Sequence, residues 1–324
     1  MTFTYSKEVS IALRQRTPLV ALETSVIAQG LPYPRNVEAA NACEAAVRAR
    51  GAVPASIAVL DGKVHIGLSG ADLERLGKGA EPLMKVASRD LAGAITSARS
   101  GGTTVSAAVE LAAMAKIPVF ATGGIGGVHR GEELDISQDL LALSRFPVAV
   151  VCAGAKTVLD LPRTLEALEA LGVPVIGIDT RDFPGFYTRA TGLPLEHHVE
   201  NAAQAAEWMR VRFGQLRQGG MVFALPPPAQ TALPAPEVEL HIAQALAAAK
   251  AAGIRGKALT PFLLNAMVER SQGRSLAANV ALLVNNAQFA AHLAVAYAGR
   301  GAHGRRRSAK KVKSPRRSAK RRGR

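Results

Sequence analysis

Cysteine and aromatic residues are scarce in this chain of 324 residues. Its two cysteines, Cys43 and Cys152, stand far apart and form no CxxC pair, which argues against a zinc site and is typical of reduced, buried thiols. Phe, Trp and Tyr make up only 4% of the residues, so Ala, Val, Leu and Ile must build the core. Because 48% of the chain is apolar, that core can still serve one large domain or two small ones.

Long uninterrupted apolar runs are also missing. No stretch of about 18 consecutive apolar residues occurs, so we expect no membrane span. Residues 1–16 lack an apolar segment of secretory length, so we expect no signal peptide. Together with the unpaired cysteines, these absences favour a cytoplasmic protein.

Acidic residues are absent from residues 300–324, which contain 13 Lys and Arg residues. Residues 1–299 contain the other 27 basic residues and all 25 acidic ones. They are therefore nearly neutral, although the whole chain has a net charge of +15. The segment RRSAK begins at Arg306 and again at Arg316. With almost no apolar content, residues 300–324 cannot offset the entropy of ordering by burial, and a disordered basic tail is predicted.

Apolar runs of strand length alternate with helical segments through most of the chain. The runs occupy residues 18–24, 56–60, 63–68, 117–122, 148–153, 173–178 and 221–225. Asp61 and Gly62 separate two of them, which is a strong signal for a two-residue β-hairpin. Strands that alternate with helices form parallel sheets covered on both faces. The sequence therefore predicts a three-layer α/β/α fold with a central mixed, largely parallel sheet, and a helical C-terminal third.

Two segments at the ends of predicted strands carry groups suited to chemistry. ATGGIGGVHRG, residues 121–131, has four glycines within residues 123–127, and their N–H groups can approach a phosphate closely, although a tight turn without a ligand has the same composition. CAGAK, residues 152–156, places Lys156 just after an apolar strand. A lysine on a loop is usually exposed, but active sites gather at the strand ends of α/β sheets. A partly desolvated lysine there is a candidate amine nucleophile.

Three carboxylates are further candidates for a role in chemistry. Glu23 ends the strand 18–24 and is an exposed strand-end carboxylate, a partner of a lysine, or a general acid. Asp139 suits the first turn of a helix, where negative charge is favourable. Asp135 is a candidate ligand for a hard divalent ion such as Mg²⁺ or Mn²⁺ that keeps several waters, although one carboxylate alone is a weak metal signal.

In order and spacing, several segments resemble the pseudouridine-5′-phosphate glycosidase family, which is related to the indigoidine A-type proteins. The resemblance covers about residues 5–299, and residues 1–299 form the predicted catalytic domain. The matching segments are ALETSVIAQGLPYPRN (21–36), MKVASRDL (84–91), GGTTV (101–105), FATGGIGGVHRG (120–131), LDISQDL (134–140), VCAGAKTVLDLPRTLE (151–166) and TPFLL (260–264).

The resemblance implies an activity and a set of roles. The family cleaves the C–C glycosidic bond of pseudouridine 5′-phosphate reversibly to uracil and ribose 5-phosphate. Lys156 would form a Schiff base, Glu23 would donate a proton, and Asp135 would bind one divalent ion per subunit, usually Mn²⁺. The residues implied to contact substrate are Lys85, Val105, Thr122, His129, Ser137, Gln138, Asp139 and Asn286. The resemblance also implies a homotrimer.

Two other functions stay open from the sequence. A Schiff-base aldolase acting on another sugar phosphate would use the same lysine, and only release of uracil separates it from the glycosidase. A nucleic-acid-binding protein is suggested by the tail and by a sequence pI near 10.4, because cationic side chains bind the phosphate backbone. The nearly neutral body argues against binding as the main function. For the tail, weak non-specific binding of nucleic acid and a merely solubilising extension both stay open.

Overall fold

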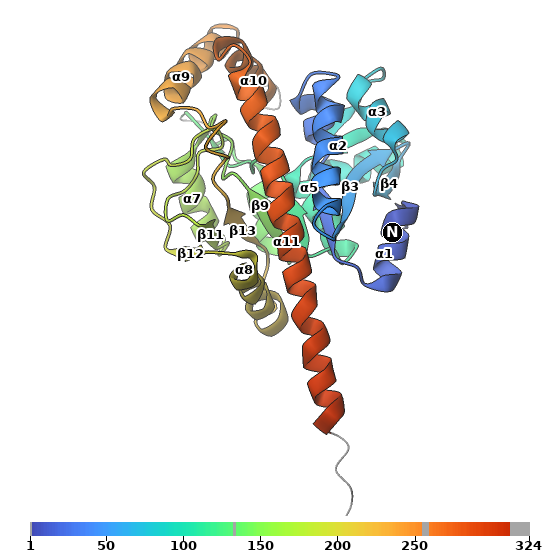
Figure 1. Cartoon of the computed structure of the whole chain (residues 1–324). Coiled ribbons are helices and arrows are strands. Elements are labelled where there is room, and N and C mark those ends of the chain that lie inside the picture. The colour runs from blue at the N-terminus through green and yellow to red at the C-terminus, as the bar shows by residue number, and fades with distance from the viewer. Residues whose placement is uncertain (1, 132–133, 255–258, 312–324) are drawn as a thin grey trace, which may run out of the picture.

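The computed structural model describes residues 2–131, 134–254 and 259–311 (Figure 1). The strands, in chain order, are β1 (Phe3–Tyr5), β2 (Leu19–Leu22), β3 (Val53–Leu60), β4 (Lys63–Ile66), β5 (Met84–Val86), β6 (Gly101–Thr103), β7 (Val119–Ala121), β8 (Val128–His129), β9 (Ala149–Cys152), β10 (Leu159–Asp160), β11 (Val175–Ile178), β12 (His197–Val199) and β13 (Met221–Ala224).

The α-helices are α1 (Lys7–Gln15), α2 (Arg35–Arg48), α3 (Gly70–Lys78), α4 (Leu91–Thr96), α5 (Val105–Met114), α6 (Gln138–Arg145), α7 (Leu161–Ala170), α8 (Ala202–Met209), α9 (Ala235–Ala251), α10 (Leu259–Arg270) and α11 (Arg274–Lys311). Shorter helical segments are η1 (Val26–Gly30, a π-helix), η2 (Ser88–Asp90, a 3₁₀-helix) and η3 (Arg210–Gln215, a π-helix).

A sheet of eleven strands runs through the described part of the chain. Its main order is β1-β4-β3-β2-β7-β9-β13-β11-β12, and β6 pairs with both β3 and β5. Neighbours are parallel from β3 through to β12, whereas β4 and β6 are each antiparallel to β3. β8 and β10 form a separate antiparallel ribbon. The predicted mixed, largely parallel sheet is confirmed.

Strand β9 illustrates why the central strands are apolar without interruption. Ala149 and Val151 belong to one hydrophobic cluster, whereas Val150 and Cys152 belong to another, and all four are fully buried. Successive side chains of a strand point to opposite faces of the sheet. Because helices cover both faces, every position of β9 is removed from water and an apolar residue is favoured at each one.

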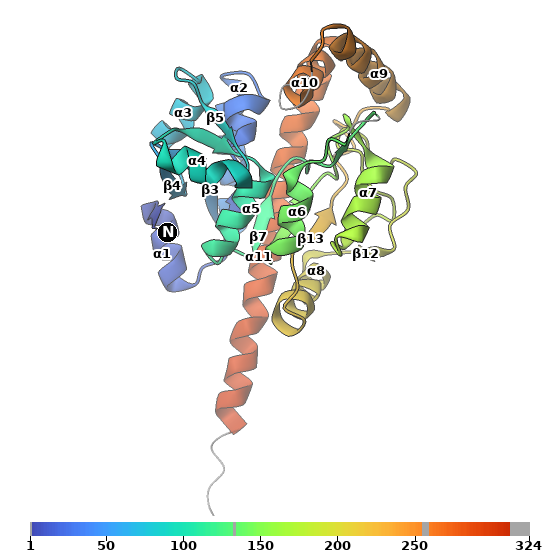
Figure 2. The same ribbon diagram turned by 180° about the vertical axis from the view of Figure 1, so that it is seen from behind.

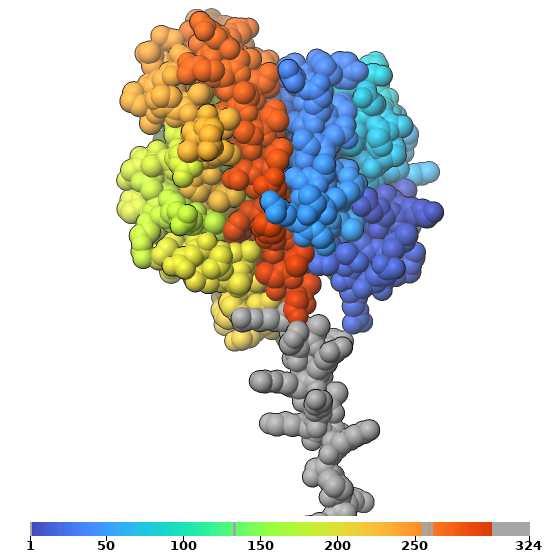
Figure 3. All heavy atoms as spheres, in the orientation of Figure 1, coloured from blue at the N-terminus to red at the C-terminus, as the bar shows by residue number. Residues whose placement is uncertain are grey.

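Helices α2, α8 and α11 cover one face of the sheet, and α5, α6 and α7 cover the other (Figures 1 and 2). Figure 3 shows α11 embedded between α2 and the second half of the chain. Small side chains of α11, including Ala287, Ala290 and Ala291, are buried and allow close packing against β2, β7 and β9. The predicted three-layer α/β/α fold and the helical C-terminal third are confirmed.

The predicted hairpin at Asp61 and Gly62 joins β3 to β4. Leu60 lies opposite Lys63, so the loop has two residues. Both loop residues have positive φ, 50° and 71°, as a type I′ turn requires. A Cβ on Gly62 would lie 2.7 Å from the carbonyl oxygen of Ile95, so glycine is also needed for close approach.

Helix α11 is long and apolar enough over Arg274–Gly299 to cross a membrane by length and composition alone, with a mean hydropathy of 1.3. No span is expected from the sequence, because polar residues interrupt the apolar run. In the structure Leu282, Leu293 and the alanines of this helix are buried against the sheet. The buried part of this window, 44% of it, is the side of the helix that packs against the sheet.

The predicted basic tail begins inside α11, which extends to Lys311 and projects from the body (Figure 1). The helix therefore overlaps the first part of the segment 300–324 that is predicted to be disordered. Residues 312–324 lie outside the described residues, and the disorder of the tail stays a prediction.

Candidate active site

A cavity of about 320 Å³ opens at the carboxyl ends of the parallel strands. Glu23 follows β2, Gly123 follows β7, and Lys156 follows β9. These three strands are neighbours in the sheet, so the loops after them converge although they are far apart in the sequence. Loops at this edge of open α/β sheets commonly form binding sites.

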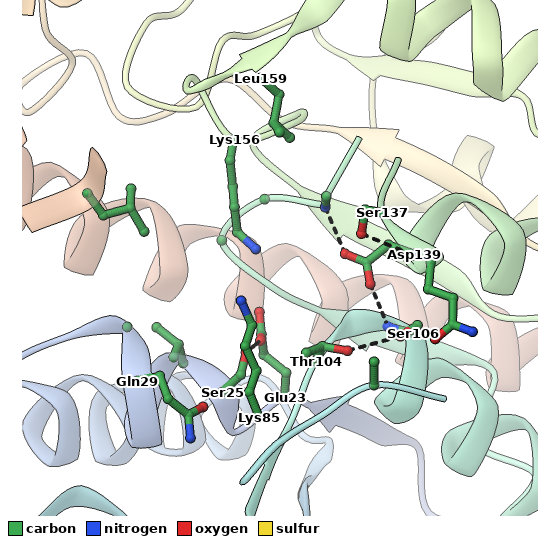
Figure 4. A pocket seen from close by; sticks show the side chains of 18 of the residues that line it. Glu23, Ser25, Gln29, Lys85, Thr104, Ser106, Ser137, Asp139, Lys156 and Leu159 are labelled. Atoms are coloured by element: carbon green, nitrogen blue, oxygen red, sulfur yellow. Dashed lines mark hydrogen bonds between the residues drawn. The ribbon is translucent and has the colours of Figure 1, made fainter. Parts of the chain in front are cut away.

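Most of the predicted site residues line this one cavity. They are Glu23, Lys85, His129, Asp135, Ser137, Gln138, Asp139 and Lys156. In Figure 4 the side chains of Lys156 and Lys85 reach toward one another from opposite sides of the cavity. The structure thus gathers an amine, a buried carboxylate and a second cation around the same space.

Lys156 belongs to a tight turn that follows β9. Its N–H donates to the carbonyl of Ile125 at 3.0 Å, and its carbonyl accepts from the N–H of Leu159 at 3.0 Å. Gly154, two residues earlier, has a left-handed φ of 83°, and a Cβ there would lie 2.0 Å from the carbonyl oxygen of Pro184. The glycine of the CAGAK segment is therefore required for the turn that presents the lysine.

Glu23 is 8% exposed, and hydroxyl groups hold both of its carboxylate oxygens. Ser25 donates to Oε2 and Thr122 donates to Oε1. Thr122 is itself buried and does not line the main cavity. The predicted substrate contact at Thr122 is thus placed behind Glu23, where its hydroxyl orients the carboxylate.

Asp139 connects the glycine-rich loop to the start of α5. Its Oδ2 accepts from the N–H of Gly126 at 2.8 Å, and its Oδ1 accepts from the N–H of Ser106 at 2.9 Å. Ser137 caps α6 by accepting from the N–H of Asp139 at 3.2 Å (Figure 4). First-turn residues of α5 and α6 line the cavity, so the positive ends of two helix dipoles face it. Such ends favour an anion.

Val105 is the first residue of α5, and its side chain is buried in the core. Val105 does not line the cavity, whereas its neighbours Thr104 and Ser106 do, so the structure does not bring its side chain to the predicted substrate site.

The pKa of His129 depends on the charged groups around the cavity. Burial lowers the pKa of its imidazole below the usual range, Asp135 acts in the opposite direction, and Lys156 and Lys85 lower it further. All three charges act on the imidazole, although the two lysines reach into the cavity from opposite sides. Since each cation disfavours a further positive charge, the imidazole is held in its neutral form.

Asp135 is the predicted ligand of a divalent ion. It is partly exposed at the cavity wall, and its carbonyl accepts from the N–H of His129 at 2.9 Å. Among the residues that the structure describes, no three His, Cys, Asp or Glu side chains gather around a common point. This donor set fits an ion that is held by one carboxylate and completed by waters and substrate oxygens, as Mg²⁺ and similar ions often are.

The cavity includes residues that sequence reasoning did not select, namely Ser25, Gln29, Arg89, Thr104, Ser106 and Asn279. Asn279 and Asn286 are two helical turns apart on α11 and share a face. Asn279 lines the cavity, whereas Asn286 is fully buried and donates to the carbonyls of Thr122 and Gly123 at 2.8 and 3.3 Å. The predicted substrate contact at Asn286 is thus placed behind the glycine-rich loop, which it supports.

An open parallel sheet whose strand ends hold a lysine, a hydroxyl-bound glutamate and two helix N-termini defines the chain as an α/β enzyme. Residues 8–296 match the family model for indigoidine synthase A like proteins. A pseudouridine-5′-phosphate glycosidase of Myxococcus xanthus (strain DK1622) is 59% identical over 300 residues, which cover 92% of this chain and 99% of that protein. A glycosidase of the same name from Staphylococcus aureus (strain MW2) is 47% identical, covering 90% and 95%. The chain belongs to the indigoidine synthase A like family, which includes these glycosidases.

Solved structures show the same fold. The prealnumycin C-glycosynthase AlnA in complex with ribulose 5-phosphate has a TM-score of 0.86 and 36% sequence identity, covering 94% of this chain and 99% of that one. An indigoidine synthase A-like protein from Thermotoga maritima has a TM-score of 0.81 and 33% identity, covering 87% and 94%. The family resemblance found in the sequence motifs is confirmed over almost the whole of residues 1–299.

Proposed function

We propose that this enzyme is a pseudouridine-5′-phosphate glycosidase, which releases uracil and ribose 5-phosphate from pseudouridine 5′-phosphate. The observation that carries the proposal is the convergence of Lys156, Glu23 and two helix N-termini on one cavity. The identity of 59% to a protein of that name supports the choice of substrate.

The substrate explains why the site needs an amine. Ordinary glycosidases protonate a leaving heteroatom with one of two carboxylates. In pseudouridine the base is joined to C1′ of ribose through carbon, which has no lone pair to protonate. The site must therefore open another path for the electrons of the C–C bond, and a lysine that forms an imine supplies one.

The first half of the reaction opens the ribose ring. Electrons of the uracil ring form a double bond to C1′ as the bond between C1′ and the ring oxygen breaks, and Glu23 gives its proton to that oxygen. The amine of Lys156 then adds to C1′, and the uracil ring regains its electrons. The hydroxyls of Ser25 and Thr122 hold Glu23 in place for this transfer.

The second half breaks the bond to uracil. The lone pair on the Lys156 nitrogen forms a C=N bond as the bond from C1′ to the base breaks. The released electron pair goes to the base carbon, which takes up a proton as the lysine nitrogen loses one. Water then hydrolyses the imine, which frees ribose 5-phosphate and restores the amine. In reverse, the same steps join uracil to the sugar phosphate.

The 5′-phosphate has a suitable place at the starts of α5 and α6. Thr104, Ser106 and Ser137 bring hydroxyls to this part of the wall, and the helix dipoles favour negative charge there. Lys85 adds a cation on the opposite side of the cavity from Lys156. We place a divalent ion, Mn²⁺ by family resemblance, at Asp135. When bound, this ion would neutralise phosphate charge and orient the substrate.

Incubation of the protein with pseudouridine 5′-phosphate and Mn²⁺ tests the proposal directly. We expect free uracil and ribose 5-phosphate in equal amounts. An aldolase that acts on another sugar phosphate would form an imine at Lys156 without releasing uracil. Absence of uracil from a folded, metal-supplied protein would reject the glycosidase.

We also propose that the enzyme is a cytoplasmic homotrimer. Unpaired, buried thiols at Cys43 and Cys152 suit a reducing compartment. For assembly, α11 offers an apolar groove that includes Leu276, Val280 and Val284, and a second copy of the chain would cover it. Light scattering should give a mass three times 33.9 kDa, and a monomer mass would reject the trimer.

A weak, non-specific affinity for nucleic acid is a separate proposal for the tail. Residues 300–324 contain 13 Lys and Arg residues and no acid. Each phosphate that such side chains neutralise releases condensed counterions, so binding should be strong only at low salt. No aromatic residue occurs in the segment, so stacking on bases can add little.

A further inference from the structure

Arg130 connects three parts of the molecule through one guanidinium group. Its Nε donates to the carbonyl of Leu159 at 3.1 Å, and its Nη2 donates to the carbonyl of Thr157 at 3.2 Å. Its Nη1 and Nη2 also donate to the two carboxylate oxygens of Glu239, each at 2.8 Å. Thr157 and Leu159 belong to the turn of Lys156, and Glu239 belongs to α9.

The chemistry of this position calls for arginine. A guanidinium is planar and carries five donors in a fixed fork, so one edge can bind carbonyls while another binds a carboxylate. The Arg130 hydrogen bonds hold the pKa of Glu239 below its usual range, and Glu239 raises the pKa of Arg130. Both groups are therefore charged at neutral pH, and the side chain of Arg130 is only 27% exposed.

The turn that Arg130 binds is also held at its other side. The hydroxyl of Thr157 donates to the carbonyl of Gly185 at 2.7 Å, and Leu159 lies opposite His129 in the β8–β10 ribbon. Arg130 follows His129 directly, so its side chain reaches back across the ribbon to the turn. The main chain that follows Lys156 is thereby tied to neighbouring elements.

We propose that Arg130 is a positioning residue for the nucleophile. By binding the carbonyls of Thr157 and Leu159, it fixes the direction in which Lys156 projects into the cavity. Through Glu239 it couples this turn to the helical layer of α9 and α10, from which Leu264 lines the cavity. The kinetic part of this inference rests on the proposed glycosidase function.

Arg274 provides a matched control. It forms the same kind of ion pair with Glu237, which also lies on α9, but its partners do not include the turn of Lys156. Arg130→Met should lower kcat by about 10²-fold with KM changed by less than about 3-fold, because a small displacement of a reacting group costs about that much. Arg274→Met should keep kcat, although it removes a comparable surface ion pair.

The variant Arg130→Lys keeps the positive charge but removes the planar set of donors. An ammonium can still pair with Glu239 but cannot reach both carbonyls in a fixed plane. We expect this variant to recover the melting temperature lost in Arg130→Met without recovering kcat. Wild-type kcat in either Arg130 variant would overturn the proposal.

Hydrogen exchange tests the inference without reference to any reaction. The amides of residues 153–160 should exchange faster in Arg130→Met and Arg130→Lys than in the wild type, and at the wild-type rate in Arg274→Met. Unchanged exchange of this peptide in Arg130→Met would overturn the positioning role. Failure of the wild type to release uracil would instead reject the proposed function, and the exchange result would stand on its own.

Discussion

Ser25 and Thr122 place a hydroxyl on each carboxylate oxygen of Glu23, and this arrangement bears on how the acid works. A hydroxyl can also accept, so one of the two can turn when Glu23 takes up a proton. The pair therefore keeps the carboxyl group in one orientation in both protonation states. At the residue scale, the position of the acid is set by its two hydroxyl neighbours as much as by its own side chain.

Glu23→Gln tests this role. The amide has almost the same shape and can still bind a hydroxyl, but it has no acidic proton to give. Substrate binding should be kept while turnover falls by about 10²- to 10⁴-fold, which is typical when a general acid is lost. Equilibrium binding and steady-state uracil release measure the two effects. Equal turnover of the Glu and Gln enzymes would exclude the acid role.

Lys156→Ala removes the proposed nucleophile. We expect turnover to fall by at least about 10³-fold, because the amine that forms the imine is gone. Borohydride added during turnover should trap a ribose-phosphate adduct on Lys156 of the wild type, detected by peptide mass. Lys116→Ala, at an exposed lysine on the loop before β7, serves as the control and should keep wild-type turnover. Turnover of the Lys156→Ala variant at a near wild-type rate would refute covalent catalysis.

Asp135→Ala tests the proposed metal ligand. The side chain is partly exposed, so its loss should leave the melting temperature nearly unchanged while the Mn²⁺ concentration needed for half-maximal activity rises strongly. Waters and substrate oxygens alone hold such an ion weakly. Titration of Mn²⁺ into chelator-treated protein gives the measurement. Full activity of the chelated wild type would contradict the metal assignment.

At the scale of elements, the glycine-rich loop is shaped by contacts from three directions. Asp139 at the start of α6 accepts from the N–H of Gly126, and Asn286 of α11 donates to the carbonyl of Gly123. Thr164 of α7 leaves no room for a side chain at Gly127, where a Cβ would lie 2.3 Å from its hydroxyl. The glycines are thus required by close packing of helices on the loop.

Gly126→Ala should disrupt this arrangement. A Cβ there would lie 2.2 Å from the Ser137 hydroxyl and 2.7 Å from Asp139 Oδ2, so the cap of α6 must move. We expect a loss of about 1–3 kcal/mol of stability, as for other overpacked sites, and a clear loss of uracil release. Thermal or denaturant unfolding and the uracil assay measure the two effects.

Gly93→Ala is the matched control for that substitution. Gly93 lies in α4 with no atom within 4 Å of the added Cβ, and alanine favours a helix by up to about 1 kcal/mol. Its melting temperature should equal or exceed that of the wild type. Equal stability and activity of the two variants would show that the packing around Gly126 does not matter.

At the scale of the whole molecule, the cavity and the tail lie at opposite ends of the sheet. Asn279 and Leu283, near the start of α11, line the cavity at the carboxyl ends of the strands. Ala294 and Tyr297, further along α11, lie beside residues that precede β2 and β7, at the amino ends. The long core helix therefore carries the basic segment away from the site (Figure 1).

Truncation after residue 299 tests this separation. The shortened enzyme should keep full glycosidase activity, since the cavity is built from residues before that point, and should lose retention of nucleic acid at about 50 mM salt. A filter-binding assay across a salt series measures retention. Failure of the full-length protein to retain nucleic acid at that salt would reject the binding role. Loss of glycosidase activity on truncation would reject the separation.

Several features of this protein followed from the sequence by itself. The apolar runs around β2, β7 and β9 predicted buried parallel strands, and Asp61-Gly62 predicted the hairpin. Both signals are local. Burial on two faces and positive φ each favour particular residue types within a few positions of the sequence. The motifs around Lys156 and Glu23 were specific enough to indicate the family.

Only the tertiary structure decided which side chains meet. Asn279 and Asn286 lie on the same face of α11, yet Asn279 lines the cavity and Asn286 supports a loop from behind. Thr122 follows a strand as Glu23 does, yet its hydroxyl binds the Glu23 carboxylate and does not reach the cavity. Arg130 binds a turn and a helix that are remote from it in the chain. Depth in the fold and the partner of a side chain depend on the order of the strands and the packing of the helices. These long-range relations leave no periodic pattern in one sequence, so they are set when the chain packs.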